Sequence, residues 1–148
     1  MTISIAMIKK GSGESDFAMA LKTYLKRIGK YTAVDTPTFS SEDTFFQAIS
    51  RQRSRTAPYL VLLDSRGKPF TSEQFAQWLG KLRDQGQQAI ILAIGPADGW
   101  SEDARKQANV LLSLGPMTLP HELARIVLSE QLYRAFTILS GHPYHTGH

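Results

Sequence analysis

The last 31 residues, Thr118 to His148, constrain the fold more than any other part of this 148-residue chain. Thr118 fits the cap of a helix and Pro120 its first turn, where a missing N–H costs nothing. Apolar residues then follow almost without interruption: Leu123, Ala124, Ile126, Val127, Leu128, Leu132, Tyr133, Ala135 and Phe136. This pattern predicts a helix to Leu139 whose polar stripe is narrow, consisting of Arg125, Ser129, Glu130 and Arg134. Such a helix must be covered on more than one side, and the second subunit of a homodimer can supply that cover.

A short polar tail follows this helix. Gly141 and Pro143 cannot extend it, and the side chains of His142, Tyr144 and His145 favour water or a ligand. The spacing of His142, His145 and His148 invites a metal interpretation. We expect no metal, because no carboxylate or cysteine lies nearby in the sequence. His121 is expected to be a polar cap near the helix start and not a catalytic residue.

Strand-like and helix-like segments alternate along the rest of the chain. Strands are expected at 2–8, 32–39, 59–63, 88–94 and 110–114, and the second is edge-like because Pro37 interrupts it. Helices are expected at 15–30, from a Ser40/Asp43 capping box to about 54, from a Thr71/Gln74 box to about 86, and at 101–109. The alternation predicts one α/β domain over residues 1–148, with a mostly parallel sheet flanked by helices.

Three loops follow expected strands, at 64–68, 95–99 and 115–119. Ligands of open α/β sheets bind beyond the carboxyl ends of the strands. The loop at 95–99 carries no phosphate-binding glycine motif, and the next helix begins with acidic residues, which disfavours a phosphorylated ligand. A ligand held by backbone hydrogen bonds and apolar walls fits better. Glycine turns between strands and helices are common, so the pattern alone leaves a purely structural role open.

The positive charge is concentrated in the first part of the chain. The net charge is +4, from 17 Lys and Arg against 13 Asp and Glu. Residues 1–57 hold nine basic and five acidic residues, whereas residues 58–148 hold eight of each. Basic residues such as Arg51, Arg53 and Arg55 can face the phosphates of a nucleic acid, or can be ordinary solvated positions on helices.

Composition excludes several classes of protein. Without cysteine, disulfide frameworks and thiolate chemistry are not available. No apolar run approaches the roughly 20 residues that span a bilayer, and the first residues do not read as a signal peptide, so we expect a soluble cytoplasmic protein. Neither a Ser-His-Asp order nor a paired-carboxylate pattern supports a hydrolase.

The segments TLPH (118–121), ARIVLSEQLYRAF (124–136) and HPYH (142–145) give the chain a resemblance. They are similar to the C-terminal signature of the SPOUT-class methyltransferases that modify pseudouridine at N3 in large-subunit ribosomal RNA, the RlmH family. Length and motif order match as well, most closely in the last third. The resemblance implies a C-terminal trefoil knot, S-adenosylmethionine as cofactor, a homodimer, and 23S rRNA within the ribosome as substrate.

The resemblance also implies roles for particular residues. The cofactor would lie against Leu63, Gly95, Pro96 and the stretch Gly115, Pro116, Met117, Thr118, Leu119 and Pro120. Tyr144 and His145 would form the methyl-transfer site, with His142 beside them on the RNA.

Two positions depart from the family pattern. Relatives commonly have GGPEG where this chain has GPADG (95–99), and a basic residue where it has Thr146. Pro96 loses an N–H and every positive φ. These departures keep a second hypothesis open, a catalytically weak ribosome-binding protein on the same fold.

Overall fold

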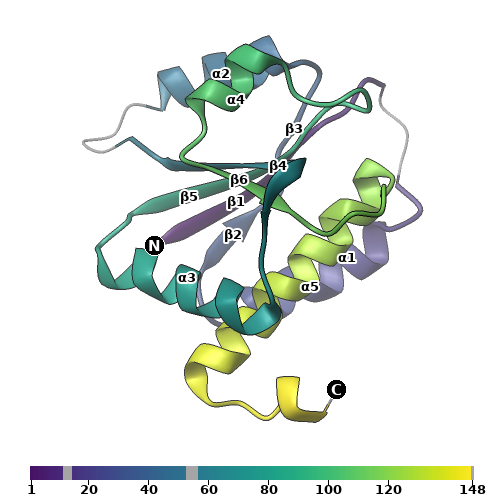
Figure 1. Ribbon diagram of the computed structural model, residues 1–148. Helices are drawn as coiled ribbons and strands as arrows, with labels where there is room; N and C mark the ends of the chain where they lie inside the picture. The colour runs from purple at the N-terminus through teal and green to yellow at the C-terminus, as the bar shows by residue number, and fades with distance from the viewer. Residues whose placement is uncertain (12–14, 53–56, 148) are drawn as a thin grey trace.

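The computed structural model describes residues 1–11, 15–52 and 57–147 (Figure 1). In chain order the elements are β1 (Thr2–Ile8), α1 (Ala18–Ile28), β2 (Ala33–Asp35), β3 (Thr38–Phe39), α2 (Glu42–Arg51), β4 (Tyr59–Pro69), α3 (Ser72–Asp84), β5 (Ala89–Ile94), α4 (Glu102–Gln107), β6 (Val110–Ser113), α5 (His121–Ser140) and the 3-10 turn η1 (His145–Gly147). Within these described ranges, no helix is long and apolar enough to cross a membrane.

The strands form one sheet in the order β2-β1-β5-β4-β6, and β3 also pairs with β1. Each of these pairings is parallel. The predicted α/β class with a mostly parallel sheet is therefore confirmed. Because the strands run the same way, their carboxyl ends meet at one edge of the sheet, where the loops after β4, β5 and β6 come together.

Helices cover both faces of the sheet. In Figure 1, α2 and α4 lie on one face, and α1, α3 and α5 on the other. Alternating side chains of β1 serve the two faces: Ile5 packs into the core with Leu79 and Leu132, whereas Ala6 packs into the core with Phe45 and Trp100. The trefoil knot implied by the resemblance remains a prediction.

Helix α5 begins and ends differently from the prediction. Pro120 is its N-cap residue and no side chain caps this end, so Thr118 is not the cap and Pro120 is not in the first turn. Gly141, with φ of 75°, closes the other end in the left-handed conformation, as glycine commonly does.

Two members of the predicted polar stripe of α5 are buried, and the other two, Glu130 and Arg134, are half-buried. Ser129 is completely buried and Arg125 is only 8% exposed. The buried hydroxyl of Ser129 has a hydrogen-bond partner within the helix, because it donates to the Arg125 carbonyl at 2.7 Å. Ile126, Val127 and Tyr133 are half-buried in the single chain, so part of the apolar surface of α5 stays accessible.

Several other boundaries differ from the sequence prediction. The N-cap of α2 is Ser41, whose hydroxyl accepts from the Thr44 N–H, and not Ser40. The Thr71/Gln74 capping box of α3 is confirmed. The expected strand at 32–39 is split into β2 and β3, consistent with the missing N–H of Pro37.

Residues 64–68 belong to strand β4 and not to a loop. The register of β4 against β6 shifts between Leu63 and Lys68, and pairing resumes at Lys68 and Pro69. Gly67 permits this close approach, because a Cβ there would lie 2.6 Å from the backbone of Leu111.

Candidate functional site

A cavity of about 720 Å³ lies at the carboxyl edge of the sheet. Its walls come from the irregular part of β4, from the segment after β5, and from the segment between β6 and α5. Eight of the nine predicted cofactor residues line it, namely Leu63, Gly95, Pro96, Gly115, Met117, Thr118, Leu119 and Pro120. Pro116 is not among the lining residues. A volume of this size is typical of sites for drug-sized ligands.

Trp100 forms a wall that the sequence analysis did not predict. Its indole is 4% exposed, and Nε1 donates a hydrogen bond to the Leu63 carbonyl at 3.1 Å. The ring packs so closely against Gly95 that a Cβ there would lie 2.7 Å from Nε1. Trp100 therefore ties the end of β5 to β4. The sequence feature that could have identified Trp100 as part of the cavity is its position between a glycine turn and the N-cap residue of α4.

The backbone of the two cavity loops is well defined by local hydrogen bonds. The Pro96 carbonyl accepts from the Gly99 N–H at 2.8 Å, which closes a turn. No described residue other than glycine has a positive φ, so this turn needs no conformation that Pro96 forbids. Gly115, with φ of 124°, does need glycine. The sulfur-bearing side chain of Met117 is 84% exposed at the cavity mouth.

Charged side chains fix one rim of the cavity. Arg105 Nε donates to Asp64 Oδ2 at 2.8 Å, and the Arg66 N–H donates to Asp64 Oδ1 at 2.8 Å. Burial alone would raise the pKa of Asp64, but these hydrogen bonds and the two guanidinium charges outweigh it and hold the pKa below its usual value. Arg105 also pairs with Glu102. This network fastens the irregular part of β4 to α4.

The C-terminal tail is docked on helices α3 and α5. The Tyr144 hydroxyl donates to Glu130 Oε2 at 2.9 Å, and its ring packs edge-on against Tyr133 with centroids 4.7 Å apart. Burial and the Glu130 carboxylate raise the pKa of Tyr144, so its hydroxyl stays protonated at neutral pH. His142 is exposed, and its Nδ1 accepts from the Tyr144 N–H at 3.2 Å. The tail is therefore more ordered than its polar sequence indicated.

The contacts of His145 fix its tautomer. Arg134 Nη1 lies 2.9 Å from Nδ1, and an arginine can only donate, so Nδ1 is the acceptor. Nε2 then carries the proton and donates to Glu73 Oε1 at 2.7 Å. This hydrogen bond holds the pKa of Glu73 below its usual value. In this docked arrangement both ring nitrogens of His145 are engaged.

The structure separates the predicted catalytic residues from the cavity within one chain. No tail residue of the described ranges lines the cavity. His121 lines the cavity, and Gly141 lies 20 residues further along. At 1.5 Å per residue, this is about 30 Å of helix. Tyr144 and His145 follow Gly141 by three and four residues, which extend at most about 14 Å. While α5 is intact, the tail cannot reach the cavity of its own chain.

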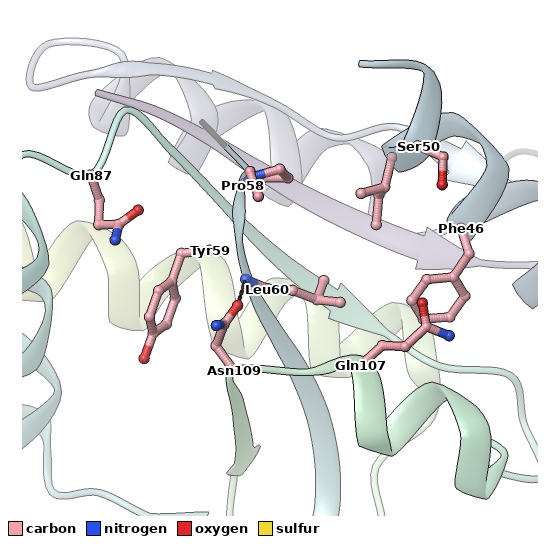
Figure 2. A pocket seen from close by; sticks show the side chains of 10 residues that line it. Phe46, Ser50, Pro58, Tyr59, Leu60, Gln87, Gln107 and Asn109 are labelled. Carbon is pink, nitrogen blue, oxygen red and sulfur yellow. Dashed lines mark hydrogen bonds between the residues drawn. The ribbon is translucent and has the colours of Figure 1, made fainter. Parts of the chain in front are cut away.

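The predicted RNA-binding arginines lie elsewhere. Arg51 is exposed at the end of α2, and Arg53 and Arg55 fall outside the described residues. Ser50, beside Arg51, lines a second cavity of about 350 Å³ at the amino-terminal end of β4 (Figure 2). There Asn109 Oδ1 accepts from the Leu60 N–H at 2.8 Å, which ties β6 to β4. Arg51 is thus at the opposite edge of the sheet from the large cavity.

Within residues 1–11, 15–52 and 57–147, the structure shows no group of three or more His, Asp or Glu residues placed to hold a metal ion.

The fold and the cavity agree with a known family. A family model described as "Predicted SPOUT methyltransferase" matches residues 1–145. The chain belongs to the SPOUT methyltransferase family.

Curated relatives narrow the comparison. The chain is 50% identical over 148 residues, all of both chains, to the Ribosomal RNA large subunit methyltransferase H of Koribacter versatilis. The protein of the same name from Mesorhizobium japonicum is 55% identical over 107 residues, 66% of this chain and 67% of the relative. The one from Rhizobium meliloti is 58% identical over 86 residues, 58% of this chain and 54% of the relative.

Asp64→Asn tests the rim network. Because the native pKa of Asp64 is lowered, its charge stabilises the fold above the pKa of the unfolded chain, and this stabilisation is lost as pH falls through the native value. We expect the variant to lose about 1–3 kcal/mol of unfolding free energy at pH 7, with the difference shrinking below about pH 4. Denaturant unfolding across pH measures it. Asp84→Asn, at an exposed ion pair with Arg83, is the control. A pH-independent difference would contradict the role of the Asp64 charge.

Proposed function

We propose that this protein is a homodimeric, S-adenosylmethionine-dependent methyltransferase that modifies N3 of a pseudouridine in the 23S rRNA of the large ribosomal subunit, in the cytoplasm. One observation carries the proposal: eight of nine predicted cofactor positions line a single cavity at the carboxyl edge. Full-length identity of 50% to a protein named Ribosomal RNA large subunit methyltransferase H supports the substrate class.

The residues of the cavity fit the proposed cofactor. Leu63, Leu114 and Leu119 provide apolar wall for an adenosyl group, and the loops at 95–99 and 115–120 provide backbone hydrogen-bonding groups. The cavity contains no phosphate-binding glycine motif, in keeping with a ligand that carries no phosphate. When bound, S-adenosylmethionine supplies an activated methyl group on a sulfonium. The protein must then orient N3 of the base toward it and accept or share the N3 proton.

The tail residues are proposed to contact the target pseudouridine base. Nδ1 of His145 accepts the hydrogen bond of Arg134, and it can take a proton once Arg134 releases the ring. Tyr144 keeps its proton and acts as a hydrogen-bond donor. His142, exposed beside them, is placed to contact RNA.

A homodimer brings the two halves of the site together. The tail cannot reach its own cavity, so we propose that the tail of one subunit closes over the cavity of the other. Ile126, Val127 and Tyr133 of α5 are apolar and only half-buried in the folded single chain. They can therefore form part of the interface while the core of each subunit stays as it is. In this arrangement each active site takes its cofactor walls from one copy and Tyr144 and His145 from the second.

Methyl transfer is the direct test of the proposed activity. Large ribosomal subunits lacking the modification are incubated with the protein and S-adenosylmethionine, and mass spectrometry of the rRNA is expected to show one new methyl group on a pseudouridine. Calorimetry is expected to show that Pro96→Gly binds the cofactor with wild-type affinity or with an affinity up to about a hundredfold higher. One restored hydrogen bond accounts for a gain of this size. Pro116→Gly, outside the cavity lining, is the matched control.

The rival function makes a different prediction for the same assay. A ribosome-binding protein without activity would bind the subunits and transfer no methyl group, and Pro96→Gly would restore transfer if the lost N–H were the cause. That outcome would contradict the proposal for the natural chain.

Mixing two inactive variants tests the shared site. Thr118→Trp fills the cavity from an exposed loop position, and His145→Ala removes the tail imidazole. Each alone should be dimeric and inactive. After subunit exchange at equal amounts, we expect about a quarter of the wild-type activity, since half of the randomly paired dimers hold one complete site. Tyr144→Ala should behave like His145→Ala. No recovery in mixtures that light scattering shows to be dimeric would contradict a site shared between subunits.

A further inference from the structure

A second concave site lies directly beside the proposed cofactor cavity. It has a volume of about 460 Å³ and is bounded by β1, α1 and α5. The first turn of α5 separates the two cavities: His121 and Ala124 line the cofactor cavity, and Glu122 and Arg125 line the second one. Both therefore open at the same end of α5, the end that faces the carboxyl edge of the sheet in Figure 1.

Arg125 is the unusual group in this second cavity. The residue is only 8% exposed, and it lines the cavity. Among the described residues no hydrogen bond or ion pair reaches its guanidinium. Burial pushes the pKa of Arg125 below its usual value, opposed only by the charge of Glu122. No buried side-chain nitrogen or oxygen among the described residues lacks a partner, so the guanidinium nitrogens of Arg125 reach the open space of the cavity, where a ligand can accept hydrogen bonds from them.

Glu122, the acidic residue among the described lining residues, is already engaged. Glu122 Oε1 accepts from Lys9 Nζ at 2.5 Å, and Oε2 accepts from the Ser15 hydroxyl at 3.0 Å. These two hydrogen bonds hold the pKa of Glu122 below its usual value, so it is ionised. Among the described lining residues, Lys9, Lys22 and Arg125 outnumber this one acidic residue, so the described lining is basic.

We propose that this cavity binds a backbone phosphate of the substrate RNA, with Arg125 as the anchor and Lys22 at the exposed mouth. The choice of RNA as the molecule that carries the phosphate rests on the proposed function. Guanidinium binds the oxygens of a phosphate through a two-pronged hydrogen bond, and a backbone phosphodiester carries a single negative charge that the basic lining can balance. A phosphate held here lies across one helical turn from the methyl donor, which would fix the register of the target nucleotide.

The test measures binding of unmodified large ribosomal subunits as a function of salt, together with methylation kinetics. Arg125→Gln is expected to raise KM at least tenfold with kcat changed less than threefold. The slope of log affinity against log salt should fall by about one unit, as for one lost phosphate contact. S-adenosylmethionine affinity should stay within twofold, and Arg125→Lys should recover part of the loss. Arg83→Gln, an exposed arginine on α3, is the control and should leave both KM and slope unchanged.

Lys22→Gln provides a second variant at an exposed position of α1, and we expect it to lower the affinity and the slope in the same direction. This variant decides the question if Arg125→Gln fails to fold. An unchanged salt slope in both variants would overturn the proposal. Dissociation of the dimer by Arg125→Gln, with normal RNA affinity per dimer, would also overturn it and assign the cavity to an acidic group of a second copy. Failure of wild type to methylate would contradict the proposed function alone, because subunit binding and its salt slope still report on this site.

Discussion

The length and rigidity of α5 determine how far the C-terminal tail lies from the two cavities. Its first turn forms a wall of both cavities, and its last turn carries the tail. An intact helix of 20 residues keeps these two ends about 30 Å apart, whereas Tyr144 and His145 extend at most about 14 Å beyond it. Leu128 and Leu132 lie in the core under the sheet, so α5 cannot bend without disrupting that packing. The proposed site, which combines the cavity with the tail, therefore takes its parts from two chains.

The parallel sheet explains why the cavities lie where they do. Because all strands end at one edge, the segments after β4, β5 and β6 converge, and Trp100 joins two of them through Leu63. Asp64 and Arg105 then hold the irregular part of β4 in place. On the other side of α5, the end of β1 brings Lys9 to Glu122. One edge of the sheet thus presents two cavities side by side, which suits the methyl donor and the RNA backbone that we propose as their ligands.

Much of the fold was predictable from local patterns. Alternating strand and helix signals predicted the parallel sheet, and Thr71 with Gln74 predicted the start of α3, since both are short-range effects. Long-range contacts were not predictable. The polar run after Leu63 continues as strand because β6 lies beside Gly67, and Arg125 and Ser129 are buried because neighbouring elements cover that side of α5. For the site, the family resemblance named nine cofactor positions, and all of them except Pro116 line one cavity. The docking of Tyr144 and His145 depends on Glu130 and Glu73, which no sequence spacing connects to the tail.

Cross-linking between copies tests the shared site most directly, because the chain has no natural cysteine. Two differently tagged variants, Thr118→Cys at the cavity mouth and Thr146→Cys in the tail, are mixed, allowed to exchange subunits and treated with a short bis-maleimide. The account predicts a covalent heterodimer carrying both tags, while each variant alone cross-links far less. A double variant in one chain that yields only an internally bridged monomer, with no heterodimer in the mixture, would contradict a cavity closed by the partner's tail.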